Sequence, residues 1–232
     1  MTTDDEGRHS IADIPQTVTD PDAIRLLEVA NGFRQFDLAR QTIEEFVAPD
    51  PARDRKFRLR PSLILQLQGE AVRGLTSYAG LFRPGSVQIG KSKHEPPSAV
   101  AVPGLVEEFC DAINDNFATA TAIRLAAYAL WRLNWIHPFV DGNGRTSRIV
   151  SHIVLNIRLG YLVPGEPTVP DLIADNKAPY YGALEIADHS HAAGQQSFEA
   201  TDLSAVENLI ARHFSTQLLS VAKAAGIAVD GA

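Results

Sequence analysis

The sequence predicts a mainly α-helical protein, a helical bundle that carries a short β-hairpin flap. Several separate segments repeat their apolar residues with a period near 3.6, which is typical of amphipathic helices. Strand-like alternation is confined to the stretch around Val87 and Ile89. Hydrophobic residues make up 45% and charged residues 21% of the 232 residues, a balance typical of a globular protein that can bury a core.

Two helices are predicted in the first part of the chain, the first of them from a helix-start signal. Asp20 precedes Pro21, and this pair is favourable because aspartate caps the free N–H groups of a first turn and proline fits the first helical position. Apolar spacing extends this helix to about residue 46, before the segment Pro49–Pro51 breaks it. A second helix is expected over residues 61–75.

The flap is predicted in the next part of the chain. Glycine and proline bracket Val87 and Ile89, which indicates a short hairpin or an extended segment. Pro96, Pro97 and Pro103 are expected to keep the following stretch non-helical. A helix is then expected from about residue 105 to residue 116.

Two further core helices are predicted on either side of residues 136–148. The first shows clear helical spacing and is expected to end near Trp135. The second is expected to close at Gly160, because glycine readily adopts the left-handed conformation that ends helices. Its buried face is predicted to hold Ile149, Val150, Ile153, Val154 and Ile157. Later helices are expected over residues 179–190 and 201–225.

Composition restricts the classes of function. The net charge of −7 argues against a protein that coats nucleic acid. No apolar run approaches the length needed to cross a bilayer, and residues 1–10 lack the apolar centre of a signal peptide. The single cysteine, Cys110, cannot form an internal disulfide. We therefore expect a cytoplasmic protein without a membrane or nucleic-acid partner.

The segment IHPFVDGNGRTSR, residues 136–148, concentrates chemically useful side chains. Gly142 and Gly144 lie at the expected start of the second core helix, where free backbone N–H groups bind anions and glycine lets a phosphate approach closely. Arg145 and Arg148 are spaced to share a helical face and to reach different phosphate oxygens. Taken alone, Arg148 is more often a structural ion-pair residue, but beside the glycine-rich turn an anion site is favoured.

Two ionisable side chains of this segment each allow two interpretations. Asp141 can cap the helix, or it can bind Mg²⁺ together with substrate phosphates, and its place beside an anion site favours the metal. His137 can be structural, or it can accept a proton near neutral pH. We expect His137 to be a general base, because it stands near the predicted phosphate site.

Residues 137–148 meet every fixed position of the pattern His-x-Phe-x-(Asp/Glu)-Gly-Asn-Gly-Arg-x-x-Arg, and the chain thus resembles the Fic proteins of the Fic/Doc superfamily. The resemblance implies a Mg²⁺-dependent protein adenylyltransferase that moves AMP from ATP to a Tyr, Ser or Thr hydroxyl of a target protein. It implies that His137 deprotonates that hydroxyl and that Asp141 holds Mg²⁺. It also assigns phosphate binding to Gly142, Asn143, Gly144, Arg145 and Arg148.

The resemblance extends over roughly residues 22–192. We expect a Fic domain with its preceding helices over residues 21–192 and a C-terminal helix over residues 193–232 that closes the core. The polar residues 1–20 before them are expected to form an N-terminal arm.

Two regions outside the signature also resemble the family. The resemblance implies that Val87, Gln88 and Ile89 of the flap dock the target as an added strand. Tyr180 and Tyr181 resemble part of a helix that borders the nucleotide base in these proteins.

Several activities of the family stay open. Transfer of UMP, phosphate or phosphocholine and removal of AMP are alternatives, although Gly144 favours AMP because the phosphotransferase branch usually has lysine there. A nucleotide-binding toxin or regulatory module without turnover is the non-enzymatic alternative, which the intact His137 and Asp141 disfavour. A homodimer and an inhibitory partner protein are also left open.

The resemblance does not settle regulation. Many Fic proteins carry an inhibitory helix with the pattern Ser/Thr-x-x-x-Glu-Gly/Asn, whose glutamate pairs with the last arginine of the signature. The nearest segment here is EVANG, residues 28–32, in which Ala30 stands at the glutamate position. Glu28 lies two residues before that position, so it would reach Arg148 only if the helix were shifted relative to the family pattern.

Overall fold

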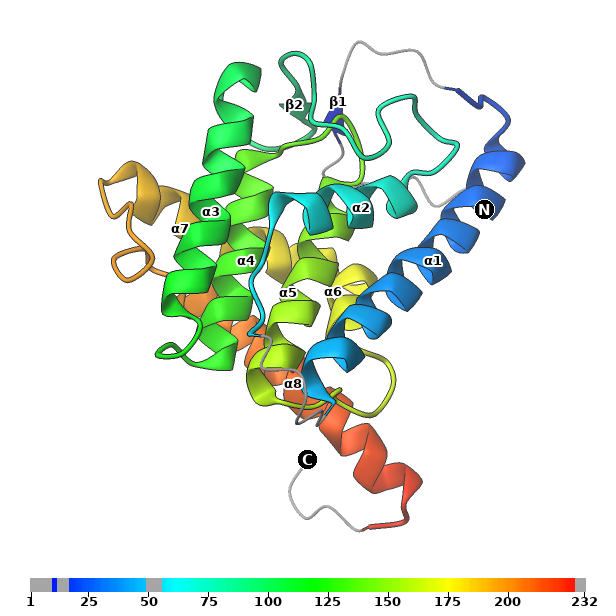
Figure 1. The fold of residues 1–232 in the computed structure, drawn as a ribbon, viewed down its shortest axis with the longest axis vertical. Coiled ribbons are helices and arrows are strands. Elements are labelled where there is room, and N and C mark those ends of the chain that lie inside the picture. Colours follow the sequence, from blue (N-terminus) through cyan, green and yellow to red (C-terminus); the bar gives the residue numbers. More distant parts are fainter. Residues whose placement is uncertain (1–9, 12–16, 49–55, 228–232) are drawn as a thin grey trace.

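The computed structural model describes residues 10–11, 17–48 and 56–227, and there the chain is mostly helical (Figure 1). The helices are α1 (Pro21–Val47), α2 (Pro61–Ala71), α3 (Val102–Asn116), α4 (Ala122–Ile136), α5 (Asn143–Leu159), α6 (Val169–Asp175), α7 (Lys177–Ala192) and α8 (Ser204–Ala224), with a 3₁₀ turn at Ala99–Ala101. Two short strands, β1 (Ser10–Ile11) and β2 (Gln88–Ile89), form one small sheet. The predicted mainly α class is confirmed.

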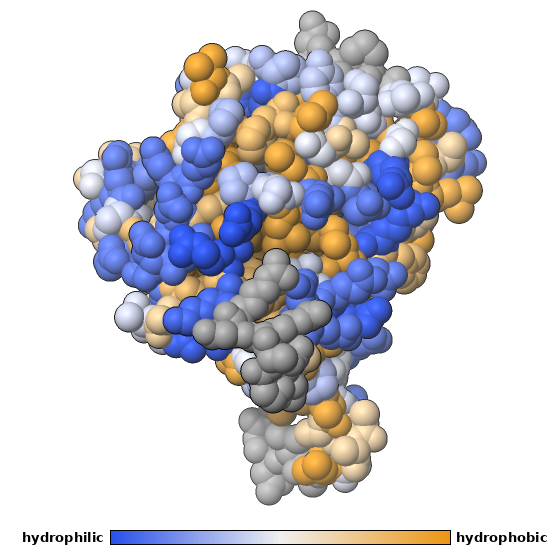
Figure 2. Space-filling model, viewed as in Figure 1, coloured by the Kyte–Doolittle hydropathy of each residue, from blue (hydrophilic) through white to orange (hydrophobic). Residues whose placement is uncertain are grey.

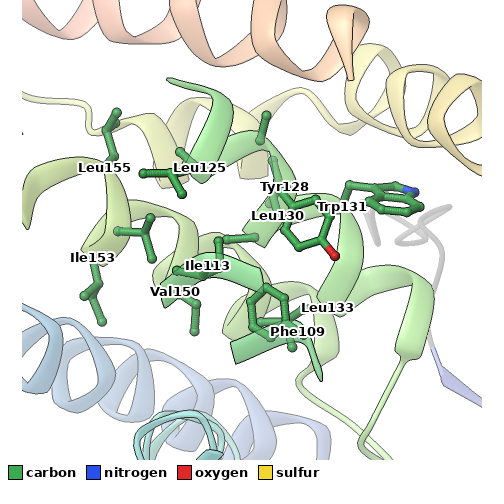
Figure 3. Close-up of a cluster of buried hydrophobic side chains, with 14 of the residues drawn as sticks. Phe109, Ile113, Leu125, Tyr128, Leu130, Trp131, Leu133, Val150, Ile153 and Leu155 are labelled. Carbon is green, nitrogen blue, oxygen red and sulfur yellow. The ribbon is translucent and has the colours of Figure 1, made fainter. Parts of the chain in front are cut away.

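The centre of the bundle is the helix pair α4 and α5, around which α1, α2, α3 and α8 pack (Figure 1). Figure 3 shows the cluster where α3, α4 and α5 meet. Its labelled side chains are Phe109, Ile113, Leu125, Tyr128, Leu130, Trp131, Leu133, Val150, Ile153 and Leu155, and all are buried. Burial of each large apolar side chain contributes roughly 1.5–3 kcal/mol of transfer free energy. The cluster therefore fixes α4 and α5, and with them the segment that joins them.

Several helix boundaries follow the predicted signals. The carboxylate of Asp20 caps α1 by accepting hydrogen bonds from backbone N–H groups of the first turn. Gly160 closes α5 in the left-handed conformation, with φ of 83°. The helix α2, however, ends at Ala71 rather than at residue 75, because the chain turns there and reaches a φ of 75° at Gly74.

One prediction about the helices is wrong, and one helix was not predicted. Pro103 does not keep its segment non-helical but lies in the first turn of α3, where a missing N–H removes no helical hydrogen bond. The helix α6 was not expected from the apolar spacing, because it is only two turns long. Its start is defined by a capping box in which Thr168 and Asp171 satisfy each other's backbone N–H groups.

The small sheet joins two parts of the chain that are far apart in sequence. The strand β2 belongs to the predicted flap, but in the described residues its partner is β1 from the N-terminal arm. The strands are antiparallel, with Ser10 opposite Ile89 and Ile11 opposite Gln88. The expected flap hairpin is therefore scarcely formed, and the arm supplies the pairing strand.

The ends of the chain are described only in part. The predicted arm over residues 1–20 is represented by β1 and by the residues from Thr17 onward. At the other end, α8 packs on α4 and α7. Within the described residues, every helix is too short or too polar to cross a membrane. Polar and apolar residues are intermixed on the face seen in Figure 2, so surface hydropathy does not by itself single out a site.

Candidate active site

The signature forms the connection between α4 and α5. The helix α4 ends at Ile136, its C-cap His137 has a left-handed backbone with φ of 50°, and α5 begins after Gly142. Asn143 holds the loop together: its Oδ1 accepts from the backbone N–H of Phe139 at 3.0 Å, and its Nδ2 donates to the Phe139 carbonyl at 2.8 Å. Phe139 is buried and stacks on Phe82. The loop is thus anchored in the core at both ends.

The start of α5 has the geometry of an anion site. The first N–H groups of a helix have no partner within the helix and point outward along its axis. Gly142 precedes them with φ of 80°, in the region that favours glycine. A Cβ atom at this position would also lie only 2.8 Å from Cγ1 of Val72. Glycine is therefore required here by both the backbone conformation and the packing.

We expect Gly142→Ala to lower the free energy of unfolding by about 1–3 kcal/mol, because alanine adds left-handed strain and a clash with Val72. Denaturant unfolding measures this. The matched control is Gly182→Ala in α7, where an added Cβ meets nothing within 4 Å and φ is not positive, so stability should not fall. Equal stability of the two variants would contradict the assigned role of Gly142.

One cavity of about 320 Å³ opens beside the start of α5. Its size falls in the range of small-molecule sites. The cavity brings together all the residues predicted for the base, the metal and the nucleotide: His137, Asp141, Gly142, Asn143, Gly144, Arg145, Arg148, Tyr180 and Tyr181. Of the three flap residues, only Ile89 lines it. The side chain of Val87 is buried and that of Gln88 is exposed.

His137 is held as a neutral imidazole with a defined orientation. Its Nδ1 lies 3.3 Å from the carbonyl oxygen of Asn134, which can only accept, so Nδ1 carries the proton. Its Nε2 lies 2.8 Å from the hydroxyl of Ser10 and is left as the acceptor. Burial lowers the pKa of His137 to about 4. At neutral pH Nε2 therefore carries no proton, and its lone pair accepts a hydrogen bond from Ser10 in the cavity.

We expect the free energy of unfolding to decrease as the pH falls from about 6.5 to about 4. Burial lowers the pKa of His137, His152 and His191 each to about 4. In this window the unfolded chain binds protons at these histidines and the folded chain does not, so acid favours unfolding. Denaturant titrations across the window measure the slope.

The variant His152→Gln should show a smaller slope than the wild type. The same change at the exposed His189 is the control. A stability that stays level from pH 6.5 to pH 4 would contradict the burial of these histidines as neutral groups.

The acidic residue of the signature is paired with an arginine. Oδ2 of Asp141 lies 2.9 Å from Nη2 of Arg145, and the Asp141 side chain is half exposed. Asp141 does not cap α5 in the usual way, because Gly142 is the N-cap and no side chain caps the helix. Arg145 is also held by the carbonyl of Ala71 at 3.1 Å and by Glu28 of α1 at 3.4 Å. The carboxylate of Asp141 therefore faces the cavity beside a cation.

Arg148 has a different environment from Arg145. Burial lowers the pKa of its guanidinium. No ion pair to Arg148 is found in the part of the chain that the structure describes. It lies close to Gly144, where an added Cβ would come within 3.2 Å of Nη1 of Arg148. The structural ion pair considered for Arg148 is thus not formed among these residues, and its charge lines the cavity.

Glu28 lies on the side of α1 that approaches the signature, but it contacts Arg145 rather than Arg148. Asn31, in the same segment, is fully buried and donates a hydrogen bond to the carbonyl of Arg73. The segment of residues 28–32 therefore lies next to the site without placing a carboxylate on Arg148.

The two tyrosines of α7 line the cavity too. Tyr180 is almost fully buried, and its hydroxyl accepts a hydrogen bond from Nδ2 of Asn134 at 2.7 Å. The ring of Tyr181 lies 5.5 Å from that of Tyr180, centre to centre. Asn134 thus connects Tyr180 to His137, because its backbone carbonyl accepts a hydrogen bond from Nδ1 of His137.

Three supporting residues were not predicted from the sequence. Arg83 is buried and donates from Nε to the carbonyl of His137 at 2.8 Å, while its backbone N–H donates to the carbonyl of Pro138 at 2.9 Å. Gln68 of α2 donates to the carbonyl of Asp141 at 3.1 Å. Asn134 is the third. Polar residues inside otherwise apolar helical stretches are the only sequence signal for Gln68 and Asn134.

Fold and site together define a class of protein. It is a helical bundle whose central helix pair presents a buried histidine next to a glycine-rich helix start, with two arginines on that helix. Residues 58–155 match the Fic/DOC family, and this range contains the flap and the whole signature. This part of the chain belongs to the Fic/DOC family.

Curated relatives share the matched region only. The "Protein adenylyltransferase Fic" of Drosophila willistoni is 34% identical over 110 residues, which are 47% of this chain and 20% of that protein. The protein of the same name from Drosophila melanogaster gives the same identity and coverage. The chain therefore spans about a fifth of the length of these relatives.

Solved structures share the fold. A Fic domain containing signaling protein from Bacteroides thetaiotaomicron superimposes with a TM-score of 0.69 at 20% identity, over 92% of this chain and 78% of that one. Fic-1 from C. elegans gives a TM-score of 0.65 at 19% identity, over 90% and 55% of the two chains. The helical architecture is thus that of Fic proteins along most of the chain.

Proposed function

We propose that this protein is an adenylyltransferase that moves AMP from ATP to a hydroxyl group of a target protein. The observation that carries the proposal is the acceptor Nε2 of His137, which faces the same cavity as the glycine-rich start of α5. A base must be uncharged to take a proton, and the lowered pKa of His137 keeps it so at neutral pH. The name of the Drosophila relatives supports the choice of AMP.

In the proposed reaction, the hydroxyl oxygen of the target attacks the α-phosphorus of ATP. Its proton passes to Nε2 of His137. The bond between the α-phosphorus and the bridging oxygen to the β-phosphate breaks, and pyrophosphate leaves with that oxygen. The N–H groups at the start of α5, together with Arg145 and Arg148, would stabilise the phosphate charge, and this is the main form of catalysis in such transfers.

Asp141 fits the role of a magnesium ligand. Its carboxylate is half exposed, lines the cavity and stands beside the predicted phosphate position. Bound Mg²⁺ would supply positive charge to the phosphate oxygens, as it does at sites that use one or two carboxylates. The ion pair with Arg145 holds the carboxylate beside this position.

We expect Asp141→Ala to remove most of the gain in ATP affinity that Mg²⁺ provides, because the carboxylate would hold the metal against the phosphates. Calorimetric titration with ATP, with and without Mg²⁺, measures the gain. Glu28→Gln is the matched control, since Glu28 also contacts Arg145 and also lines the cavity. If Mg²⁺ increases the ATP affinity of Asp141→Ala as much as that of the wild type, Asp141 is not a metal ligand and only forms the ion pair with Arg145.

Transfer of UMP, phosphate or phosphocholine, removal of AMP, and binding without turnover are the competing activities. Gly144 speaks against phosphate transfer, because the site keeps the glycine at which the phosphotransferase branch usually has lysine. The target would dock on the flap as an added strand, where Ile89 borders the cavity and where β2 pairs with β1 in this structure.

The test is incubation with ATP labelled at the α-phosphorus and with Mg²⁺, alone and with cell lysate, beside His137→Ala. A labelled protein band that is lost in the variant supports nucleotidyl transfer. Labelling by another nucleoside triphosphate and not by ATP would mean that the protein transfers that nucleotide instead of AMP. Tight ATP binding without any labelled protein would favour the binding module.

A further inference from the structure

The strand β1 occupies the place where the flap would receive a target. It pairs with β2 in antiparallel register, and this register sets Ser10 opposite Ile89 at the rim of the cavity. Figure 1 shows β1 and β2 next to each other, above the start of α5. A strand added to an exposed edge is a common way to hold a peptide. The two residues of β1 are therefore paired with the flap as a strand of a peptide substrate would be paired.

The hydroxyl of Ser10 is positioned for reaction by two side chains of the signature. Oγ of Ser10 lies 2.8 Å from Nε2 of His137 and 3.0 Å from Nδ2 of Asn143. Nδ2 of Asn143 can only donate, and Nε2 of His137 is the free acceptor because Nδ1 carries the proton. The Ser10 hydroxyl therefore accepts from Asn143 and donates its own proton to His137. This is the arrangement that a general base requires of its substrate.

We propose that Ser10 is a self-modification site, whose hydroxyl receives AMP from the chain's own active site. The inference rests on the proposed adenylyl transfer and adds its substrate. Oγ of Ser10 attacks the α-phosphorus of ATP, and the hydroxyl proton moves to Nε2 of His137. The bond to the bridging oxygen of the β-phosphate breaks. The products are Ser10 carrying AMP through a phosphodiester bond, and pyrophosphate.

The geometry favours reaction within one molecule. The contacts between Ser10 and His137 are made inside a single chain, so the hydroxyl is already within hydrogen-bonding distance of the base. Such positioning replaces a bimolecular encounter. The other serine on the cavity wall, Ser92, uses its hydroxyl to accept from the backbone N–H of His94. Of the two, only Ser10 contacts His137 among the described residues.

The experiment uses the full chain with ATP labelled at the α-phosphorus and Mg²⁺, followed by peptide mapping. We expect the label on the peptide that contains Ser10, loss of that label in Ser10→Ala, and its retention in Ser10→Thr, which keeps a hydroxyl. Ser77→Ala is the matched control, since Ser77 is exposed and lies outside the cavity. Self-labelling that is unchanged in Ser10→Ala, or that maps to another residue, would overturn the inference.

A mixing experiment tests whether the reaction stays within one chain. His137→Ala keeps Ser10 but lacks the base, and Ser10→Ala keeps the base but lacks the hydroxyl. We expect a mixture of the two to leave the Ser10 peptide unlabelled. Label on that peptide would mean transfer between chains and would contradict the single-chain route.

The same reaction with added cell lysate distinguishes a failure of the Ser10 inference from a failure of the proposed adenylyl transfer. Wild-type protein that labels lysate proteins but never its own Ser10 would overturn this inference and leave the proposed adenylyl transfer standing. Wild-type protein that labels neither itself nor any lysate protein would overturn both.

Discussion

Replacing His137 by alanine is expected to lower the rate of AMP transfer at least about 10²–10⁴-fold, the contribution typical of a positioned base. Binding of ATP should stay within about threefold of the wild type, because the imidazole contacts Ser10 and Asn134 rather than the arginines of the phosphate site. Label incorporation measures the rate, and calorimetric titration measures the binding.

His137 also ends α4 with a left-handed backbone, so the control must keep that conformation. His137→Asn does so, because asparagine tolerates a positive φ but does not take up a proton near neutral pH. Both variants should be inactive, and His137→Asn should unfold at nearly the denaturant concentration of the wild type. A variant that loses ATP affinity and activity in equal measure would contradict the role of base.

Replacing Arg148 by alanine is expected to weaken ATP binding about 10- to 100-fold, and AMP binding much less. The guanidinium is largely desolvated and is free of an ion pair among the described residues, so its charge is available to the outer phosphates. A charge-assisted hydrogen bond contributes roughly 1.5–3 kcal/mol, which corresponds to this loss. Titration with ATP and with AMP compares the two ligands.

Arg148→Lys is the informative control. Lysine keeps the charge but loses the planar fork that bonds two phosphate oxygens at once, so its affinity should lie between those of the wild type and Arg148→Ala. Equal weakening of ATP and AMP in Arg148→Ala would place Arg148 away from the outer phosphates.

The helices could largely be predicted because their signals are local. Asp20 with Pro21 defines the start of α1, and Gly160 defines the end of α5 through its own backbone. The errors arose where a boundary depends on a turn or on a short capped helix. Val72 leaves the helical region at the end of α2, and the capping box of Thr168 starts a helix too short to show apolar periodicity.

The residues of the candidate site could be predicted because the signature places them within one short segment, which folds as a loop and a helix start. Their partners could not, because these come from distant parts of the chain. Arg83 reaches the carbonyl of His137 from the flap region, and Glu28 reaches Arg145 from α1. The pairing of β1 with β2 joins residues that are far apart in sequence. The contact between Ser10 and His137 therefore could not be predicted from the residues around Ser10.

The central claim is that the bond broken in ATP is the one between the α- and β-phosphates. The most direct test runs two parallel reactions with the wild-type protein, Mg²⁺ and lysate, one with ATP labelled at the α-phosphorus and one with ATP labelled at the γ-phosphorus. We predict that only the α-label becomes bound to protein and that the γ-label leaves as pyrophosphate. Protein labelled by the γ-phosphorus, or by neither, would contradict the account.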